Sequence, residues 1–222
     1  KEFLRDMISN ISHQLKTPLA ALDLYMEILT REPENAEAVS AFTQKSLRSL
    51  ERMEQLIRSL LKMARLDTGS IVFEKGYCPV SEIAAQAVGE LAERAKREQK
   101  QILFEGIHEE RIFCDPEWTK EAVENLVKNA LDHTDAGGVI RICWKSTPVI
   151  LRLTVEDDGC GIAPEDIYHI FRRFYRSGSL GDRQGAGLGL PLAKAIVEGQ
   201  GGSLNVESSP GEGSIFTITF PA

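Results

Sequence analysis

An apolar stripe along residues 3–22 places the strongest constraint on how this chain folds. On a helical wheel at about 100° per residue, its apolar side chains fall in one sector roughly 120° wide. The members of this sector are Leu4, Met7, Ile8, Ile11, Leu15, Pro18, Leu19 and Leu22. A second stripe at helical spacing covers residues 39–64, after a proline-containing break at 31–35. The pattern predicts two amphipathic helices in a hairpin, and because a hairpin leaves apolar surface in water, we expect a homodimeric four-helix bundle.

One polar residue of the first helix stands out. His13 lies nearly opposite the apolar sector, and Thr17 follows one turn later on the same face. An exposed histidine on a helix is usually an ordinary surface residue. Here Pro18 follows it inside a strong helical pattern, where proline removes a backbone donor, kinks the helix and costs about 3 kcal/mol. His13 is therefore a candidate for chemistry.

The residue pattern of the sequence changes at Ser70, where predicted short strands begin to alternate with predicted helices. The pattern predicts strands at 71–73, 101–104, 111–114, 139–144, 149–155, 203–207 and 214–220, and helices at 79–100, 115–133 and 191–199. Asp115 and Pro116 mark the start of the middle helix as a cap and a first-turn proline. These elements predict an α+β sandwich, with helices on one face of a mixed sheet.

Composition excludes several classes of function. The 222 residues carry a net charge of −7, all of it outside residues 1–67, which hold ten basic and ten acidic residues. An acidic module argues against nonspecific nucleic-acid binding. The four cysteines form no C-x-x-C pair, which argues against a zinc site or a disulfide scaffold and fits a reducing cytosol. No run reaches the roughly 20 apolar residues of a membrane span, and because the chain opens without Met we expect a fragment of a longer protein.

Polar and glycine-rich strings of the second part indicate a nucleotide site. The polar row on the helix at 117–134 consists of Glu121, Asn125, Lys128, Asn129 and Asp132. A solvated face is the ordinary reading of such a row, but a D-x-G-x-G string follows at 157–161, an aromatic segment at 170–176 and a G-x-G-x-G string at 185–189. The last string also fits a Rossmann loop. We reject that reading because the string lies late in the chain and no βαβ repeat follows it.

In this order, these strings and the segment Ser12-His13-Gln14-Leu15-Lys16-Thr17-Pro18 resemble the catalytic core of bacterial two-component sensor histidine kinases. Their ATP-binding part belongs to a superfamily shared with type II topoisomerases and mismatch-repair ATPases. The resemblance implies an ATP-dependent protein-histidine kinase. It assigns residues 1–67 to a dimerisation and phosphotransfer domain and 70–222 to a catalytic ATP-binding domain.

The resemblance also implies roles in binding ATP and Mg²⁺. Asn129 would ligate Mg²⁺ through its amide oxygen, Asp157 would accept the adenine amine, and Arg173 or Arg176 would be available to phosphate. The segment 177–184 is expected to be the ATP lid. The full nucleotide-binding set comprises Asn125, Lys128, Asn129, His133, Asp157, Gly159, Gly161, Ile162, Phe174, Arg176, Gly185, Gly187, Leu188 and Gly189.

The family pattern further implies that His13 accepts the γ-phosphoryl group and passes it to an aspartate on a response-regulator receiver domain. Gln14 departs from the pattern, since most relatives carry an acid there. Glutamine can fix the imidazole tautomer but cannot be a general base. Thr17 would hold water for dephosphorylation of the regulator. The full-length protein is expected in the cell membrane, with this portion in the cytoplasm.

Smaller departures lie in the nucleotide site. Asp132 stands where many relatives have Lys, and His133 where many have Tyr. Cys160 is expected to be a buried, inert thiol. Asn125 takes the place of the glutamate that activates water in related ATPases, which disfavours an alternative function as an ATP-hydrolysing machine. A third alternative, a scaffold without catalysis, requires a broken nucleotide site, and Asp157 and Asn129 are intact.

Overall fold

The computed structural model describes residues 2–31, 35–177 and 186–221, and the chain divides into two compact units. The first unit is Lys1–Leu61, which we call the helical unit, and the second is Lys62–Ala222, which we call the C-terminal unit. Each is described by itself. Within the described ranges no helix is both long and apolar enough to span a lipid bilayer.

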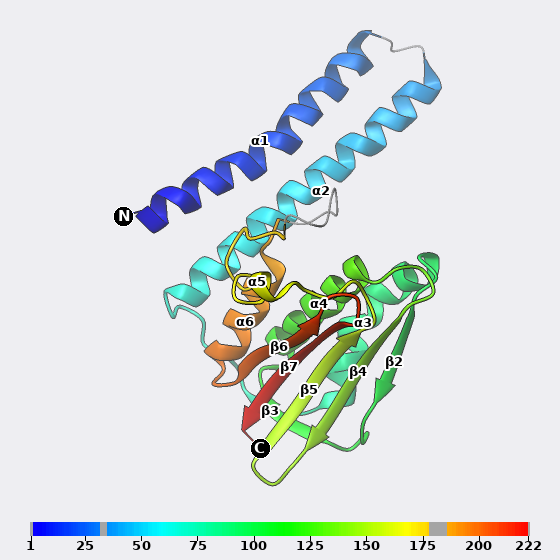
Figure 1. Ribbon diagram of the computed structural model, residues 1–222. Helices are drawn as coiled ribbons and strands as arrows, with labels where there is room; N and C mark the ends of the chain where they lie inside the picture. The colour runs from blue at the N-terminus through cyan, green and yellow to red at the C-terminus, as the bar shows by residue number, and fades with distance from the viewer. Residues whose placement is uncertain (1, 32–34, 178–185, 222) are drawn as a thin grey trace. The chain divides into compact units, whose positions relative to one another are not determined.

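The helical unit is the predicted hairpin of α1 (Glu2–Arg31) and α2 (Ala36–Asp67), which lie side by side (Figure 1). The rings of Tyr25 and Phe42 pack across the pair at 5.6 Å, and the small residues Ser46 and Ser49 are buried. Large apolar side chains of both helices nevertheless stay exposed, namely Ile8, Leu19, Leu24, Met26, Leu47, Leu50, Ile57 and Leu61. The hairpin therefore covers only part of its apolar stripes.

Pro18 does not interrupt α1, which continues from Glu2 to Arg31 as one helix. Because proline lacks an N–H group, the carbonyl of Gln14 loses the donor that the helical ladder would supply. One turn earlier, the Thr17 hydroxyl donates to the His13 carbonyl at 3.3 Å. The irregular point of the backbone thus lies beside His13.

The C-terminal unit is a five-stranded sheet covered on one face by helices (Figure 1). The strand order is β2 (Gln101–Glu105), β4 (Val139–Ser146), β5 (Ile150–Asp157), β7 (Gly213–Pro221) and β6 (Ser203–Ser209). Only the β2–β4 pair is parallel. The covering helices are α3 (Val80–Arg97), α4 (Pro116–His133) and α6 (Gly189–Gly199). Two further strands, β1 (Gly76–Pro79) and β3 (Arg111–Cys114), form a separate ribbon, and α5 (Pro164–Ile167) is a single turn.

Alternation along the central strands explains the one-sided packing. In β4, Ile140 and Ile142 are fully buried, whereas the intervening Arg141 lies between Glu105 at 3.9 Å and Glu156 at 3.6 Å. Buried side chains of this size each contribute about 1.5–3 kcal/mol through removal from water. The other face of the sheet is mostly polar, although Leu103 and Ile215 are exposed on it, and this fits a single layer of helices.

The prediction of a helical hairpin followed by an α+β sandwich is confirmed. The start of α4 follows the predicted signal, since Asp115 accepts a hydrogen bond from the Trp118 amide at 3.2 Å and Pro116 opens the helix. The predicted strand at 71–73 is wrong, because this segment is irregular and Val72 is 87% exposed. The predicted lid at 177–184 lies, except for Ser177, outside the described residues.

Candidate functional site

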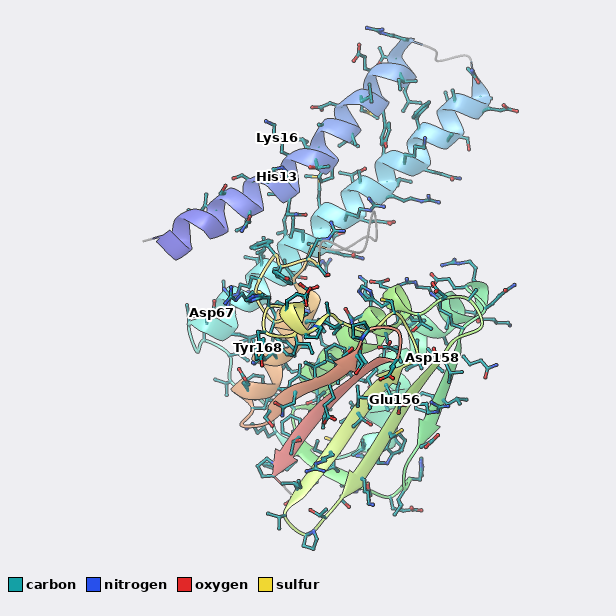
Figure 2. All side chains as sticks on the ribbon, viewed as in Figure 1. His13, Lys16, Asp67, Glu156, Asp158 and Tyr168 are labelled. Atoms are coloured by element: carbon teal, nitrogen blue, oxygen red, sulfur yellow. The ribbon has the colours of Figure 1, made fainter. Side chains whose placement is uncertain are left out.

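The candidate acceptor residues lie in the middle of α1, where Figure 2 locates His13 and Lys16. His13 and Thr17 are exposed and Gln14 is half-buried. His13 is therefore open to a reacting group, as its position opposite the apolar sector predicts. The Thr17 hydroxyl that donates to the His13 carbonyl still has its lone pairs available to water.

Asp157, at the end of β5, is a buried acid with one unused oxygen. The residue is 3% exposed, and its Oδ1 accepts a hydrogen bond from the Gly159 amide at 3.0 Å. Its Oδ2 is buried and has no hydrogen-bond partner among the described residues. The pKa of this carboxyl is raised to about 6, mainly by burial and to a lesser extent by the charge of the neighbouring Asp158. A buried acceptor of this kind fits an N–H donor of a ligand, such as the amine of adenine.

The glycines after Asp157 are required by close backbone approach. A side chain at Gly159 would lie 2.3 Å from the His133 carbonyl oxygen, and one at Gly161 would lie 1.9 Å from the Ser209 carbonyl oxygen. Gly161 also has φ +69, a conformation that favours glycine. The next residue, Ile162, donates its amide to the Ser208 hydroxyl at 2.8 Å. The first glycine string thus forms a tight loop between the end of α4 and the β6–β7 hairpin.

The polar row on α4 divides into structural and available residues. Glu121 pairs with Lys62 at 2.6 Å and Asp132 pairs with Arg94 of α3 at 2.6 Å. Between them, the Asn125 side chain donates to the Glu121 carbonyl at 2.8 Å, while the side chain of the half-buried Asn129 makes no hydrogen bond with another described residue. Lys128, on the same row, is exposed. The Asn129 amide is therefore available to an ion or a ligand.

The N-terminus of α6 faces the same amide row. Leu188 precedes the helix and provides no side-chain cap, and no hydrogen bond from a described side chain caps the first amides of α6. A side chain at Gly189 would lie 3.0 Å from Asn125 Oδ1, which brings the start of α6 against α4. An open helix N-terminus attracts anions such as phosphate. This end of α6 and the amides of α4 together suit a phosphate group.

A backbone hydrogen bond joins the aromatic segment to the second glycine string. The Phe174 amide donates to the Gly187 carbonyl at 2.8 Å, and both residues have positive φ. Arg173 pairs with Asp67 at 2.6 Å, so it is less available to phosphate than predicted, while Arg176 is exposed. The hydroxyls of Ser177 and Tyr175 donate to Asp166 and lower the pKa of its carboxyl.

The expectation that the Cys160 thiol is buried is wrong, while its inertness stays a prediction. The residue is half-buried and lines a cavity of about 390 Å³ between the loop after α4 and the first glycine string. Its Sγ lies 3.9 Å from Nδ1 of His133, the last residue of α4. His133 thus contributes both its carbonyl and its ring to this corner of the site.

The candidate nucleotide-binding residues of the C-terminal unit come from four neighbouring segments. These are α4, the loop after β5, the segment after α5, and the start of α6. Gly185 lies outside the described residues. His13, Gln14 and Thr17 belong to the helical unit. No motif of the sequence singles out Thr134, which follows His133 and is 3% exposed, with a hydroxyl that has no hydrogen-bond partner among the described residues. Its position directly after the polar row was the available signal.

Family models match both parts of the chain. The model of the histidine kinase-, DNA gyrase B- and HSP90-like ATPase matches residues 114–222, and the model of the His Kinase A phospho-acceptor domain matches residues 3–69. The sensor-like histidine kinase SenX3 of Mycobacterium bovis is 30% identical over 220 residues, which cover 98% of this chain and 54% of that protein. The sensor protein kinase PmrB of Pseudomonas aeruginosa is 33% identical over 204 residues, covering 91% and 42%. The chain spans about half the length of the curated relatives it matches.

Solved structures share the fold. The Acinetobacter baumannii histidine kinase AdeS has a TM-score of 0.79 at 20% identity, covering 94% of this chain and 97% of that one. The histidine kinase ThkA in complex with the response regulator protein TrrA has a TM-score of 0.81 at 21% identity, covering 99% and 62%. Full-length ShkA in complex with AMPPNP has a TM-score of 0.72 at 24% identity, covering 96% and 45%.

Proposed function

This chain belongs to the sensor histidine kinases of two-component signalling, and from that premise we propose that it transfers the γ-phosphoryl group of ATP to a ring nitrogen of His13. The observation that carries the proposal is that one chain holds both an exposed histidine on α1 and a buried, unpartnered acceptor at Asp157 Oδ2. The first is a nucleophile open to attack, and the second suits adenine. AMPPNP in ShkA, a relative in fold, supports an adenine nucleotide as the ligand.

The residues present fit ATP and Mg²⁺. Asp157 would hold the adenine amine, the amides at the start of α6 would hold phosphate oxygens, and the Asn129 amide would ligate Mg²⁺ beside them. Neutral oxygen ligands suit a cation that already shares the charge of a triphosphate. When bound, Mg²⁺ offsets negative charge on the phosphates. Asn125 lacks the carboxylate that would activate water, which favours transfer to protein over hydrolysis.

Neutral imidazole is the nucleophile at His13. As the bond from its ring nitrogen to the γ-phosphorus forms, the bond from that phosphorus to the β,γ-bridging oxygen breaks, ADP leaves, and a proton leaves the ring. Gln14 accepts a hydrogen bond but takes no proton, so the proton goes to water. The phosphohistidine then donates to an aspartate of a response-regulator receiver domain, and Thr17 positions water for the reverse, dephosphorylating activity. The response regulator bound to ThkA supports this class of partner.

We assign residues 1–67 to a dimerisation and phosphotransfer domain and residues 70–222 to a catalytic ATP-binding domain. The exposed apolar stripe of the hairpin supports a homodimer built as a four-helix bundle. The full-length protein is proposed to be anchored in the cell membrane with this portion in the cytoplasm. Its relatives are sensor kinases roughly twice as long as this chain.

Acid-labile labelling of the protein by [γ-³²P]ATP tests the proposal. We expect His13→Ala to abolish the label while ADP binding stays at the wild-type level. His108→Ala, which removes an exposed histidine of the C-terminal unit, is the matched control and keeps the label. Phosphate release without labelled protein would favour the ATP-hydrolysing alternative, and absence of nucleotide binding in calorimetry would favour the non-catalytic scaffold.

A further inference from the structure

Thr134 carries a buried hydroxyl whose purpose the fold alone does not explain. The residue directly follows α4, is 3% exposed, and its Oγ1 has no hydrogen-bond partner among the described residues. Leaving a buried hydroxyl unsatisfied costs about 1–3 kcal/mol, and most buried polar groups have a partner. Valine has the same shape and would avoid this cost, so we expect the hydroxyl to have a role that valine could not fill.

A second unpartnered atom lies at the same corner, on Asp157. Ile140 of β4 pairs with Asp157 of β5, so the residues just before β4 run alongside those just after β5. Figure 2 marks this corner by Glu156 and Asp158, which flank Asp157. A side chain at Gly159 would lie 2.8 Å from Asp157 Oδ1 and 2.3 Å from the carbonyl oxygen of His133, the residue before Thr134.

The orientation of Thr134 is set by its methyl group. A side chain at Gly138 would lie 2.2 Å from Thr134 Cγ2 and 2.7 Å from Asp158 Oδ1. The methyl therefore packs against the loop before β4, and the hydroxyl occupies a different direction around Cβ. The Asp158 carboxylate is already used, since its Oδ1 accepts the Val139 amide at 2.9 Å. Asp158 thus holds the loop, whereas Thr134 Oγ1 and Asp157 Oδ2 are each buried without a hydrogen-bond partner among the described residues.

We propose that Thr134 is a specificity-determining residue for the adenine base, with its hydroxyl and the free oxygen of Asp157 together recognising the polar edge of the ring. This inference rests on the proposed function. The 6-amino group of adenine is a donor next to N1, an acceptor. Asp157 Oδ2 can accept from the amino group, and the Thr134 hydroxyl can donate to N1. Guanine presents the reverse order of donor and acceptor, so both groups would oppose it.

Calorimetry with ADP and its analogue 1-deaza-ADP, in which N1 is replaced by C–H, tests the assignment. We expect Thr134→Val to weaken ADP binding about fivefold, the equivalent of one hydrogen bond of about 1 kcal/mol. The same variant should bind 1-deaza-ADP within twofold of wild type, because that ligand has no acceptor with which the Thr134 hydroxyl could form a hydrogen bond. Thr134→Ser keeps the hydroxyl and should bind ADP as wild type does.

Each other outcome has a distinct meaning. Unchanged ADP affinity in Thr134→Val overturns the inference, and so does an equal loss for both ligands, which indicates a structural disturbance. If Thr134→Val does not fold, a loss of the ADP preference over 1-deaza-ADP in Thr134→Ser overturns it. Wild-type protein that binds no adenine nucleotide would instead contradict the proposed function itself.

Discussion

Asp157 is the residue at which binding and stability oppose each other most clearly. Its pKa is raised from 3.8 to about 6, mainly by burial. Because this pKa is higher in the folded than in the unfolded protein, protonation of the carboxyl stabilises the folded state. This stabilisation is complete below the unfolded pKa and is lost as the pH rises through the folded pKa. At pH 7 the buried charge therefore costs the folded protein about 3 kcal/mol.

Asp157→Asn should accordingly raise the melting temperature of the nucleotide-free protein at pH 7 and abolish ADP binding. The gain should shrink as the pH falls from 6 to 4, because the wild-type carboxyl is then protonated. Thermal denaturation followed by circular dichroism at several pH values measures this. Asp158→Asn removes a neighbouring exposed charge that is a lesser cause of the raised pKa of Asp157, so its gain should be smaller than that of Asp157→Asn. A lower melting temperature for Asp157→Asn at pH 7 would contradict the account.

Gln14 is the residue at which a gain of activity is expected. Gln14→Glu supplies a carboxylate that can orient the imidazole and take its proton, so autophosphorylation of His13 at neutral pH should rise about tenfold or more. Initial rates of label incorporation measure the effect, with Gln44→Glu as a control that adds the same charge to an exposed site of the hairpin. An unchanged or lower rate in Gln14→Glu would refute the role assigned to Gln14.

Candidate site residues could be selected from the sequence, whereas the side chains that they pair with could not. The pattern predicts roles for Asp157 and Asn129, because their spacing and residue types are local properties, and these roles stay predictions. Asp132 lies in the same row, but the structure pairs it with Arg94 of α3, 38 residues earlier. The Asp132 carboxylate is therefore held in a salt bridge to Arg94. Only the packing of α3 against α4 distinguishes it from its neighbours.

At the scale of the elements, the loop after β5 depends on backbone approach. Gly161→Ala combines the strain of φ +69 with an overlap against the Ser209 carbonyl at 1.9 Å. Gly201→Ala is a matched control, since Gly201 has φ +88 but nothing within 4 Å. Positive φ costs each variant about 1–2 kcal/mol. We expect only Gly161→Ala to weaken ADP binding by tenfold or more, and equal affinities in calorimetry would show that the approach to Ser209 is unimportant.

The segment before α3 shows where element prediction failed. Residues 71–73 are apolar and β-branched or aromatic, which favours a strand. Phe73 instead packs edge-on against Trp118 at 5.9 Å, and the Glu74 amide donates to the Asp115 carboxylate at 2.8 Å. Strand β1 forms later, at Gly76–Pro79, where glycine and proline are residues that local propensity does not favour in a strand. Its pairing with β3 comes from contacts distant in sequence, which local propensity does not report.

At the scale of the whole molecule, the exposed apolar stripe predicts self-association. Leu47 of α2 is 53% exposed, so Leu47→Glu introduces a charge where a second copy would bury the leucine. We expect sedimentation velocity to show a shift from dimer to monomer, while ADP affinity stays unchanged because the nucleotide residues lie in the other unit. Gln44→Glu should remain dimeric. A monomeric wild-type protein would remove the basis of the bundle.

The packing of the end of α2 determines where a stable fragment of this protein can begin. Residues 62–67 continue the helix of the hairpin, yet they belong to the C-terminal unit, where Met63 is fully buried, Lys62 pairs with Glu121 and Asp67 pairs with Arg173. An isolated ATP-binding fragment that begins at Ser70 would lack this cover. It should melt earlier and be digested faster by protease than one that begins at Lys62. The end of a helix is thus a poorer guide to an autonomous fragment than the packing of its last two turns.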